Sequence, residues 1–252
     1  MVMREATKAF GAVLILLLVN VGFCFGALPN SGFESGMTGW TSVYENDGSN
    51  ISFGNESYST TDYHYSGASA LWGKASIVGD YNPSGPPYPW DAPGRDWCRT
   101  YVWSGLTDLT NVTSIKFYLT DFQSGSYFPY GWGWGQEVWL VVSDGTYTAQ
   151  ALLAENHQTP YGIPLPSTAS VGSDGRSWLG FDIALTSANF SGLNSLNKSS
   201  AKVGVCWEAD SWTYGSQTLW AGAAVDDIQL TPEPATISLL AFGGILLLRR
   251  KK

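Results

Sequence analysis

Histidine and cysteine are scarce in this sequence, and charged side chains make up only 13% of it. The two histidines, His64 and His157, have no neighbour at the spacing of a metal site, and no Gly-x-Ser-x-Gly motif of a serine hydrolase accompanies them. We therefore expect both histidines in solvated loops, without a catalytic role.

Basic residues are also rare in the middle of the chain. Between Ala27 and Thr231 there are seven basic and 19 acidic residues, a formal charge of −12. Such a surface repels a phosphate backbone, which argues against nucleic acid as a partner. An acidic, lysine-poor and tryptophan-rich body fits an extracellular domain that handles neutral ligands or divalent cations, although acidity can also serve solubility alone.

Long helical patterns are absent too, whereas aromatic residues reach 14% and glycine numbers 29. Short runs rich in Val, Ile, Thr, Trp and Tyr recur between clusters of Gly, Pro, Asn and Asp, a pattern typical of strands and turns. The sequence predicts an all-β fold, a two-sheet antiparallel sandwich of the jelly-roll kind, over residues 27–231. Its strands are expected at 50–53, 70–77, 97–104, 114–121, 137–143, 147–153, 178–184, 202–208 and 219–230.

The first 26 residues have the layout of a secretory signal peptide. Arg4 and Lys8 precede an apolar run over 9–19, which predicts a signal helix. Cys24 and Gly26 then supply the small residues that signal peptidase reads, so the mature chain is expected to begin near Ala27. A lipoprotein signal at Cys24 is the weaker alternative, because the bulky Phe23 precedes it.

The other end of the chain, residues 232–252, has three parts in a fixed order. Pro232, Glu233 and Pro234 come first, a 14-residue apolar stretch over 235–248 follows, and four basic residues beginning with Arg249 and Arg250 end the chain. Basic residues prefer the cytoplasmic side of a membrane. The apolar stretch predicts a hydrophobic helix that is shorter than the roughly 20 residues of a comfortable span, so a buried helix is the alternative.

This tail resembles the PEP-CTERM sorting signal of exported proteins in Gram-negative bacteria that make exopolysaccharide. The resemblance covers about the last 22 residues. It implies that the chain is the substrate of an exosortase, a membrane-embedded cysteine enzyme that reads the Pro-Glu-Pro motif. It also implies export through the inner membrane to the cell surface or the extracellular matrix, with the tail in the membrane before processing.

The borders of the body resemble the first and last strands of carbohydrate-binding-module-like jelly rolls. The resemblance rests on residues 28–34, Leu-Pro-Asn-Ser-Gly-Phe-Glu, and residues 224–230, Ala-Val-Asp-Asp-Ile-Gln-Leu. In that group the two strands lie side by side, and their acidic residues often hold a structural calcium ion. The resemblance implies Glu34 and Asp226 as Ca²⁺ ligands, with Asp227 as the substitute for the opposite strand parity. Alternatively, the two aspartates only charge an edge strand against aggregation.

Removal of the signal peptide leaves two cysteines, Cys98 and Cys206, in a compartment where thiols oxidise. A disulfide between them is expected. Strand parity argues mildly against this disulfide, because Cys206 shares its predicted face with the polar Lys202 and Glu208.

All 12 tryptophans lie in the body. Exposed planar rings stack on the faces of sugars, and the glycine-flanked Trp132 and Trp134 are the best candidates for such a platform. Trp90, Trp212 and Tyr214 could extend it. The alternative is that most of these rings fill the core or plug loops, as aromatic residues commonly do. That core role is the expectation for Trp97, Trp103, Trp139, Trp178 and Trp207.

Three hypotheses follow for the function of the body. The first is a non-catalytic extracellular protein whose sandwich binds carbohydrate, and the second is a purely structural matrix or surface protein without a specific ligand. The third, a glycan hydrolase or lyase, would need two facing carboxylates about 5 to 10 Å apart, for which Glu137, Glu155 and Glu208 are the candidates.

Overall fold

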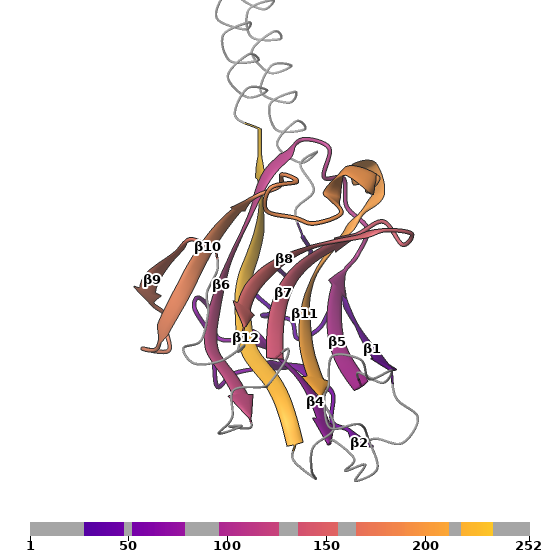
Figure 1. The fold of residues 1–252 in the computed structure, drawn as a ribbon. Coiled ribbons are helices and arrows are strands. Elements are labelled where there is room, and N and C mark those ends of the chain that lie inside the picture. Colours follow the sequence, from indigo (N-terminus) through magenta and orange to yellow (C-terminus); the bar gives the residue numbers. More distant parts are fainter. Residues whose placement is uncertain are drawn as a thin grey trace, which may run out of the picture.

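In the computed structural model, the described residues (28–47, 52–78, 96–125, 136–155, 165–211 and 218–233) form two antiparallel sheets packed face to face (Figure 1). The five-stranded sheet has the order β1 (Trp40–Asp47), β5 (Asp96–Ser104), β11 (Lys202–Ser211), β7 (Gln136–Ser143), β8 (Thr148–Glu155). The seven-stranded sheet has the order β2 (Ser52–Phe53), β4 (Ala70–Val78), β12 (Thr218–Pro232), β6 (Val112–Gly125), β10 (Ser177–Ala184), β9 (Ser167–Val171), and β3 (Glu56–Thr60) also pairs with β4. The predicted all-β sandwich is confirmed, whereas the two predicted terminal helices lie outside the described residues.

Helical structure in the described residues is confined to two single 3₁₀ turns, η2 (Leu193–Ser195) and η3 (Lys198–Ser200). Within that part of the chain, no helix has the length and hydropathy to cross a membrane.

The core lies between the sheets and follows the period of two along each strand. In β5 the buried residues Cys98, Thr100 and Val102 alternate with half-buried ones, as expected for a strand with one face inside. Trp207 of β11 is fully buried and packs against Gly73 of β4, across the gap between the sheets. A side chain at position 73 would collide with the indole ring, so glycine is needed where this large residue crosses the sandwich.

The strands that the sequence did not predict are β1, β3 and β9, and each of them lies at the edge of a sheet. Their residues are largely exposed, and β9 has the burial pattern of a strand without an apolar face. An edge strand needs little hydrophobic alternation, which removes the signal on which the prediction depends.

The last strand, β12, lies beside the residues that begin the body. The N–H of Ile228 in β12 donates to the carbonyl of Ser31 at 3.1 Å, so residues 28–34 lie beside the last strand, although they form turns and not a strand. Pro232, the first residue of the Pro-Glu-Pro motif, still pairs with Val112 of β6, and the Glu233 N–H donates to Asn111. The fold therefore continues two residues past the predicted boundary at 231.

Candidate functional site

The outer face of the five-stranded sheet carries a set of aromatic side chains. On β5 the residues that point away from the core are Trp97, Arg99, Tyr101 and Trp103, and all four are half-buried. The register places Cys206 of β11 beside Tyr101, and Trp139 of β7 follows on the next strand. An apolar row therefore crosses three adjacent strands on the side of the sheet that faces away from the core.

The rings of Tyr101 and Trp103 form a platform on this face. Their planes differ by 11° and their centroids are 5.4 Å apart. Trp103 also lies across Gly204 of β11, where an added Cβ would come within 2.6 Å of the indole. The lack of a side chain at Gly204 lets the indole rest on the neighbouring strand, and both Tyr101 and Trp103 are half-buried.

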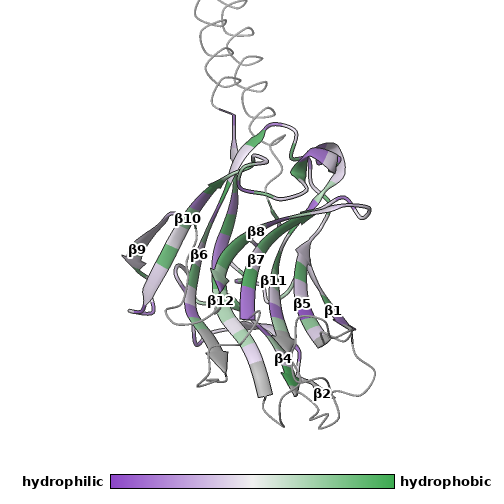
Figure 2. Ribbon diagram, in the orientation of Figure 1, coloured by the Kyte–Doolittle hydropathy of each residue, from purple (hydrophilic) through white to green (hydrophobic). Residues whose placement is uncertain are grey.

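A second row, next to the aromatic one, is charged. The strand register aligns one residue from each of the five strands, namely Glu45, Arg99, Glu208, Glu137 and Glu155. Figure 2 shows the change in character along β7, which is purple at its start and green beyond it. Polar groups that can bind hydroxyls thus flank rings that can stack.

Arg99 on β5 is the one cation among these five residues and lies between Glu45 and Glu208. Its Nη2 donates to Glu208 Oε1 at 3.0 Å, and its guanidinium lies 4.4 Å from the ring centroid of Trp97. Burial of the guanidinium opposes its charge, but the hydrogen bond and the charge of Glu208 outweigh this and raise the pKa of Arg99. Because both partners are partly withdrawn from water, the pair holds its geometry better than an exposed one would.

The predicted disulfide between Cys98 and Cys206 is not formed in the structure. Cys98 lies in the core between the sheets, whereas Cys206 points to the outer face of the same sheet, beside Tyr101. Adjacent strands alternate in step, so an odd offset in register puts two side chains on opposite faces. Burial and the nearby Glu208 also raise the pKa of the Cys206 thiol well above its usual value, which disfavours the reactive thiolate.

The seven-stranded sheet has aromatic residues on its outer face as well, and the chain itself packs two tyrosines against some of them. Tyr63 stacks on Trp72 with ring centroids 5.3 Å apart, and Tyr65 stacks on Tyr118 at 3.3 Å. Tyr65 also meets the edge of Trp178, which is fully buried. Tyr63 and Tyr65 thus cover parts of Trp72 and Tyr118, and all four of these rings are half-buried.

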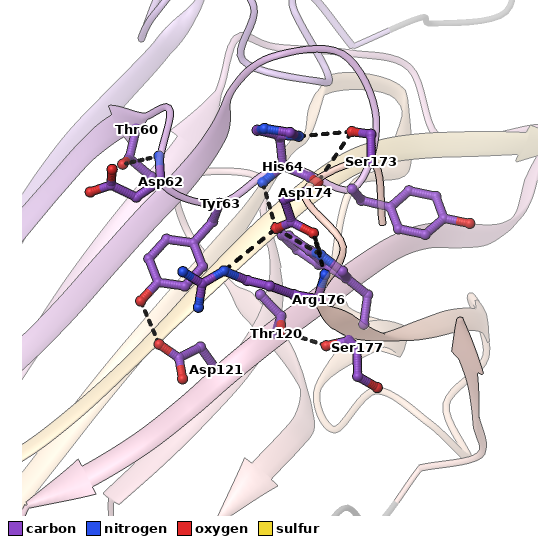
Figure 3. Close-up of polar contacts among 12 residues, drawn as sticks. Thr60, Asp62, Tyr63, His64, Thr120, Asp121, Ser173, Asp174, Arg176 and Ser177 are labelled. Atoms are coloured by element: carbon purple, nitrogen blue, oxygen red, sulfur yellow. Dashed lines mark hydrogen bonds and ion pairs between the residues drawn. The ribbon is translucent and has the colours of Figure 1, made fainter. Parts of the chain in front are cut away.

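Polar contacts fasten one end of this segment to the turn between β9 and β10 (Figure 3). Asp174 accepts from the N–H of His64 at 3.1 Å, and His64 Nδ1 lies 2.7 Å from Ser173 Oγ. Arg176 lies over the ring of Tyr63, whose hydroxyl donates to Asp121 at 2.5 Å. Although partial burial opposes its ionisation, hydrogen bonds from the Arg176 and His64 backbone lower the pKa of Asp174.

The predicted calcium ligands hold the other end of the same segment. Asp226 is fully buried and accepts from the N–H groups of Tyr65 and Ser66 at 2.8 and 3.1 Å. Glu34 accepts from the N–H groups of Ala68 and Ser69 at 2.9 and 3.3 Å. The fold therefore brings Glu34 and Asp226 to one segment, where backbone donors occupy the oxygens that a cation would use.

No group of three His, Cys, Asp or Glu side chains with the arrangement of a metal site occurs among the described residues. Asp227 follows Asp226 at a bulge in β12 and has a left-handed backbone, with φ of 51°. Its side chain is half-buried beside Gly32. Burial is the main reason that the pKa of Asp226 rises to about 7. Calcium binding by Glu34 and Asp226 remains a prediction.

Several predicted site residues lie outside the described part of the chain. They are the aromatic candidates Trp90, Trp132, Trp134, Trp212 and Tyr214, and the tail residues Pro234, Arg249 and Arg250. Their predictions stay open.

The sequence predicted a core role for five tryptophans, and for Trp97, Trp103 and Trp139 this was wrong. They are half-buried on the outer face, whereas Trp178 and Trp207 are fully buried, as predicted. One signal could have separated them. Trp97 and Trp103 share their parity in β5 with Arg99, a residue that rarely faces a core.

No protein-family profile matches the chain, and no curated protein is detectably similar in sequence. Solved structures with a similar arrangement include the family 11 carbohydrate-binding module of a cellulosomal cellulase of Clostridium thermocellum. It aligns with 11% identity over 82% of this chain and 95% of the module, at a TM-score of 0.40. A family 11 module of the same organism, in complex with a β-1,3-1,4-mixed-linked tetrasaccharide, aligns with 10% identity over 83% and 97%, at 0.41.

A third similar structure is TmCBM61 in complex with β-1,4-galactotriose. It aligns with 14% identity over 82% of this chain and 99% of the module, at a TM-score of 0.35. These likenesses concern the β-sandwich architecture, and the sugars named are ligands of those modules.

Proposed function

We propose that the body of this protein binds polysaccharide on the outer face of its five-stranded sheet, without catalysis. The observation that carries the proposal is the platform of Tyr101 and Trp103, two nearly parallel rings, of which Trp103 lies across Gly204. A pyranose ring has an apolar face that stacks on such a surface. Its hydroxyls, at the rim of the ring, then meet the charged row that contains Arg99 and Glu208.

The charged row suits hydroxyl recognition because the positions of its side chains are fixed before a ligand binds. Glu208 is 8% exposed and already accepts from Arg99, so little side-chain entropy is lost on binding. A carboxylate next to a guanidinium offers acceptors and donors side by side, which matches a pair of vicinal hydroxyls. Stacking on the platform supplies affinity, and the charged row determines the orientation of the bound sugar.

Binding is tested by electrophoresis of the protein through gels that contain a panel of soluble polysaccharides. We expect at least one polysaccharide to retard the protein, and Trp103→Ala and Tyr101→Ala to abolish most of the retardation. Tyr147→Ala is the matched control, because this tyrosine is 53% exposed in the turn between β7 and β8. Retardation that survives both platform substitutions would refute the site.

The alternative of a purely structural protein predicts that no polysaccharide in the panel retards it.

One observation favours the third hypothesis, a glycan hydrolase or lyase. Glu208, Glu137 and Glu155 are register neighbours on adjacent strands. A pair of carboxylates at such spacing is compatible with glycoside hydrolysis. New reducing ends that appear with the native protein and disappear with Glu137→Gln would replace the binding proposal by a catalytic one.

For the whole chain we propose export and processing at the tail. The order of signal peptide, body, Pro-Glu-Pro motif, apolar stretch and basic end supports this, with signal peptidase and an exosortase as partners and the surface or matrix of a Gram-negative bacterium as destination. Cleavage after Glu233 would leave the described fold complete, because β12 ends at Pro232.

Processing is tested by the intact mass of the protein recovered from a host with an exosortase. We expect a chain that begins near Ala27 and lacks the basic end, and a Glu233→Ala variant that keeps it. Recovery of the native protein with Arg249 and Arg250 still attached would contradict the proposal.

A further inference from the structure

The tail leaves the body at one end of the sandwich, and only a short link joins it to the fold. Pro232 still pairs with Val112 of β6, and the apolar stretch of the tail begins at Ala235. An extended chain covers at most about 3.5 Å per residue, so the link from Pro232 to Ala235 reaches about 10 Å. Whatever holds the apolar stretch therefore lies close to this end of the sandwich.

The apolar stretch is too short to keep the body far from a membrane that contains it. As a helix, its 14 residues would be about 21 Å long, whereas the hydrocarbon core of a bilayer is about 30 Å thick. Such a mismatch is relieved by thinning of the bilayer or by drawing the flanking residues toward it. The end of the sandwich at which β12 ends would then touch the lipid headgroups.

Three connections of the chain lie at this end, beside the last residues of β12 (Figure 1). They run from β5 to β6 (105–111), from β7 to β8 (144–147) and from β10 to β11 (185–201), and together we call them the exit end. Hydrogen bonds join them. The Leu109 N–H donates to the carbonyl of Lys198 at 2.7 Å, and the Asn197 N–H donates to Asp144 Oδ2 at 2.8 Å. The exit end is therefore one continuous surface.

The exit end exposes two large apolar side chains. Leu106 is 66% exposed and Tyr147 is 53% exposed, and they belong to two different connections. Removal of an exposed aliphatic side chain from water is favourable. Tyrosine is enriched where proteins meet the headgroups of a bilayer, because its ring is apolar and its hydroxyl is polar. Both side chains therefore suit contact with a membrane.

The exit end also lacks the negative charge that dominates the body. Of the 19 acidic residues between 27 and 231, its connections contain Asp108 and Asp144, against Lys198, and Lys202 follows at the start of β11. Glu233, at the start of the tail, adds one acid. Asp144 accepts from three backbone N–H groups, whereas neither lysine forms an ion pair within the part of the chain that the structure describes. Two lysines are thus available to anionic headgroups.

We propose that the exit end is a membrane-contact surface, which lies on the headgroups of an anionic phospholipid bilayer while the tail is in place. Leu106 and Tyr147 enter the headgroup region, and Lys198 and Lys202 contact lipid phosphates. The inference rests on the proposed function, since it needs the tail in a membrane before processing. The contact would hold the end of β12 within reach of the membrane-embedded enzyme that reads the Pro-Glu-Pro motif.

The test uses the full chain in vesicles of phosphatidylethanolamine and phosphatidylglycerol, with a spin-label quencher on some of the headgroups. A fluorophore is attached to Leu106→Cys or, as the matched control, to Val171→Cys. Val171 is 74% exposed and pairs with the first residue of β10, about 23 Å along that strand from its last residue, which leads into the exit end. We expect the label of Leu106→Cys to be quenched at least threefold more strongly. The native chain, treated with the same label, gives the background from its own cysteines.

The preference for anionic lipid is tested with the same label. Lys198→Glu together with Lys202→Glu should lower the quenching of Leu106→Cys to the level seen in vesicles of phosphatidylcholine, because lipid phosphates would then face carboxylates. Quenching that is the same in both lipids, and in the presence or absence of the two lysines, would overturn the assignment of anionic headgroups.

The outcomes also separate this inference from the proposed function. A full chain that does not float with the vesicles in a density gradient would refute the membrane role of the tail, and this inference with it. A chain that floats with them, but whose label at Leu106→Cys is quenched no more than that at Val171→Cys, would overturn the membrane-contact surface alone.

Discussion

Two tryptophans in this sandwich owe their positions to glycines on neighbouring strands. Trp103 lies across Gly204 on the outer face, and Trp207 lies against Gly73 between the two sheets. In both places a methyl group would take space that the indole ring fills. Single glycines therefore decide where a large ring can lie, in one case for the site and in the other for the core.

Gly73→Ala tests this at the core position. The new methyl group would press on Trp207, which is fully buried and cannot move aside, so we expect a loss of about 1–3 kcal/mol in the free energy of unfolding. Urea unfolding of the full chain measures it. Gly105→Ala is the control, because a Cβ there would meet no atom within 4 Å. Equal midpoints for the two variants would contradict the packing argument.

Asp226 should make stability depend on pH. Burial raises its folded-state pKa to about 7, above the value of about 3.9 in an unfolded chain. The neutral acid is therefore the form that the fold prefers, and its contribution is complete below pH 4 and is lost as the pH rises through 7. We expect the native protein to lose more stability between pH 4 and 8 than Asp226→Asn, by an amount on the order of a few kcal/mol.

Thermal midpoints of both proteins in the presence of a chelator, taken at several pH values, provide the measurement. The chelator is needed because a bound cation would favour the ionised carboxylate. Parallel pH profiles for the native and Asp226→Asn proteins would show that the carboxyl titrates near its ordinary value.

At the level of single elements, the segment 61–69 is fixed to the sheet by acidic side chains on both of its ends. Glu34 and Asp226 receive four of its backbone N–H groups, and Asp174 receives a fifth. Backbone N–H groups that form no ladder bonds need other acceptors, and the oxygens of these acidic side chains supply them. The aromatic stacking beneath it depends on this attachment.

The calcium prediction is tested on the same element. If Ca²⁺ is held by Glu34 and Asp226, a chelator should lower the thermal midpoint of the native protein and leave that of Glu34→Gln unchanged, since an ion bound only to the folded state stabilises it. A native midpoint that does not respond to chelator or to millimolar Ca²⁺ would remove the metal assignment.

The sequence predicted the interior strands well because their burial is periodic. Residues 138–142, apolar on both parities, lie in β7, inside the five-stranded sheet, and the alternation over 115–120 matches the two faces of β6. The edge strands β1 and β9 carry no such period and were missed. A local hydrophobic pattern in the sequence thus indicates a strand only where one face of that strand is buried.

The site was harder to predict than the fold, because it depends on register. The charged row consists of five residues from five strands, and nothing local in the sequence relates Glu45 to Glu155. The pairing of Cys98 and Cys206 was wrong for the same reason, since two cysteines in one sheet can point to opposite sides. Within a single strand, by contrast, the sequence alone indicates that Arg99 and Trp103 lie on the same face.

At the scale of the whole molecule, both sheets carry aromatic side chains on their outer faces, but these rings have different stacking partners. Both sheets present half-buried aromatic rings outward, but on the seven-stranded sheet the chain's own Tyr63 and Tyr65 stack on rings of the strands, whereas the platform consists of two rings of β5 itself. The stacking of Tyr65 on Tyr118 shows the kind of contact that the platform would offer to a ligand. The charged row beside the platform, with Arg99 and Glu208 paired, is the main reason to place binding on the five-stranded sheet.

The central claim is that the platform of Tyr101 and Trp103 binds polysaccharide, and one calorimetric titration tests it most directly. The ligand is the polysaccharide that retards the native protein most, and the proteins are the native chain, Trp103→Ala and Tyr147→Ala. We predict that Trp103→Ala weakens binding at least tenfold, which is about 1.4 kcal/mol, and that Tyr147→Ala leaves it unchanged. Equal affinity of the native chain and a folded Trp103→Ala variant would contradict the claim.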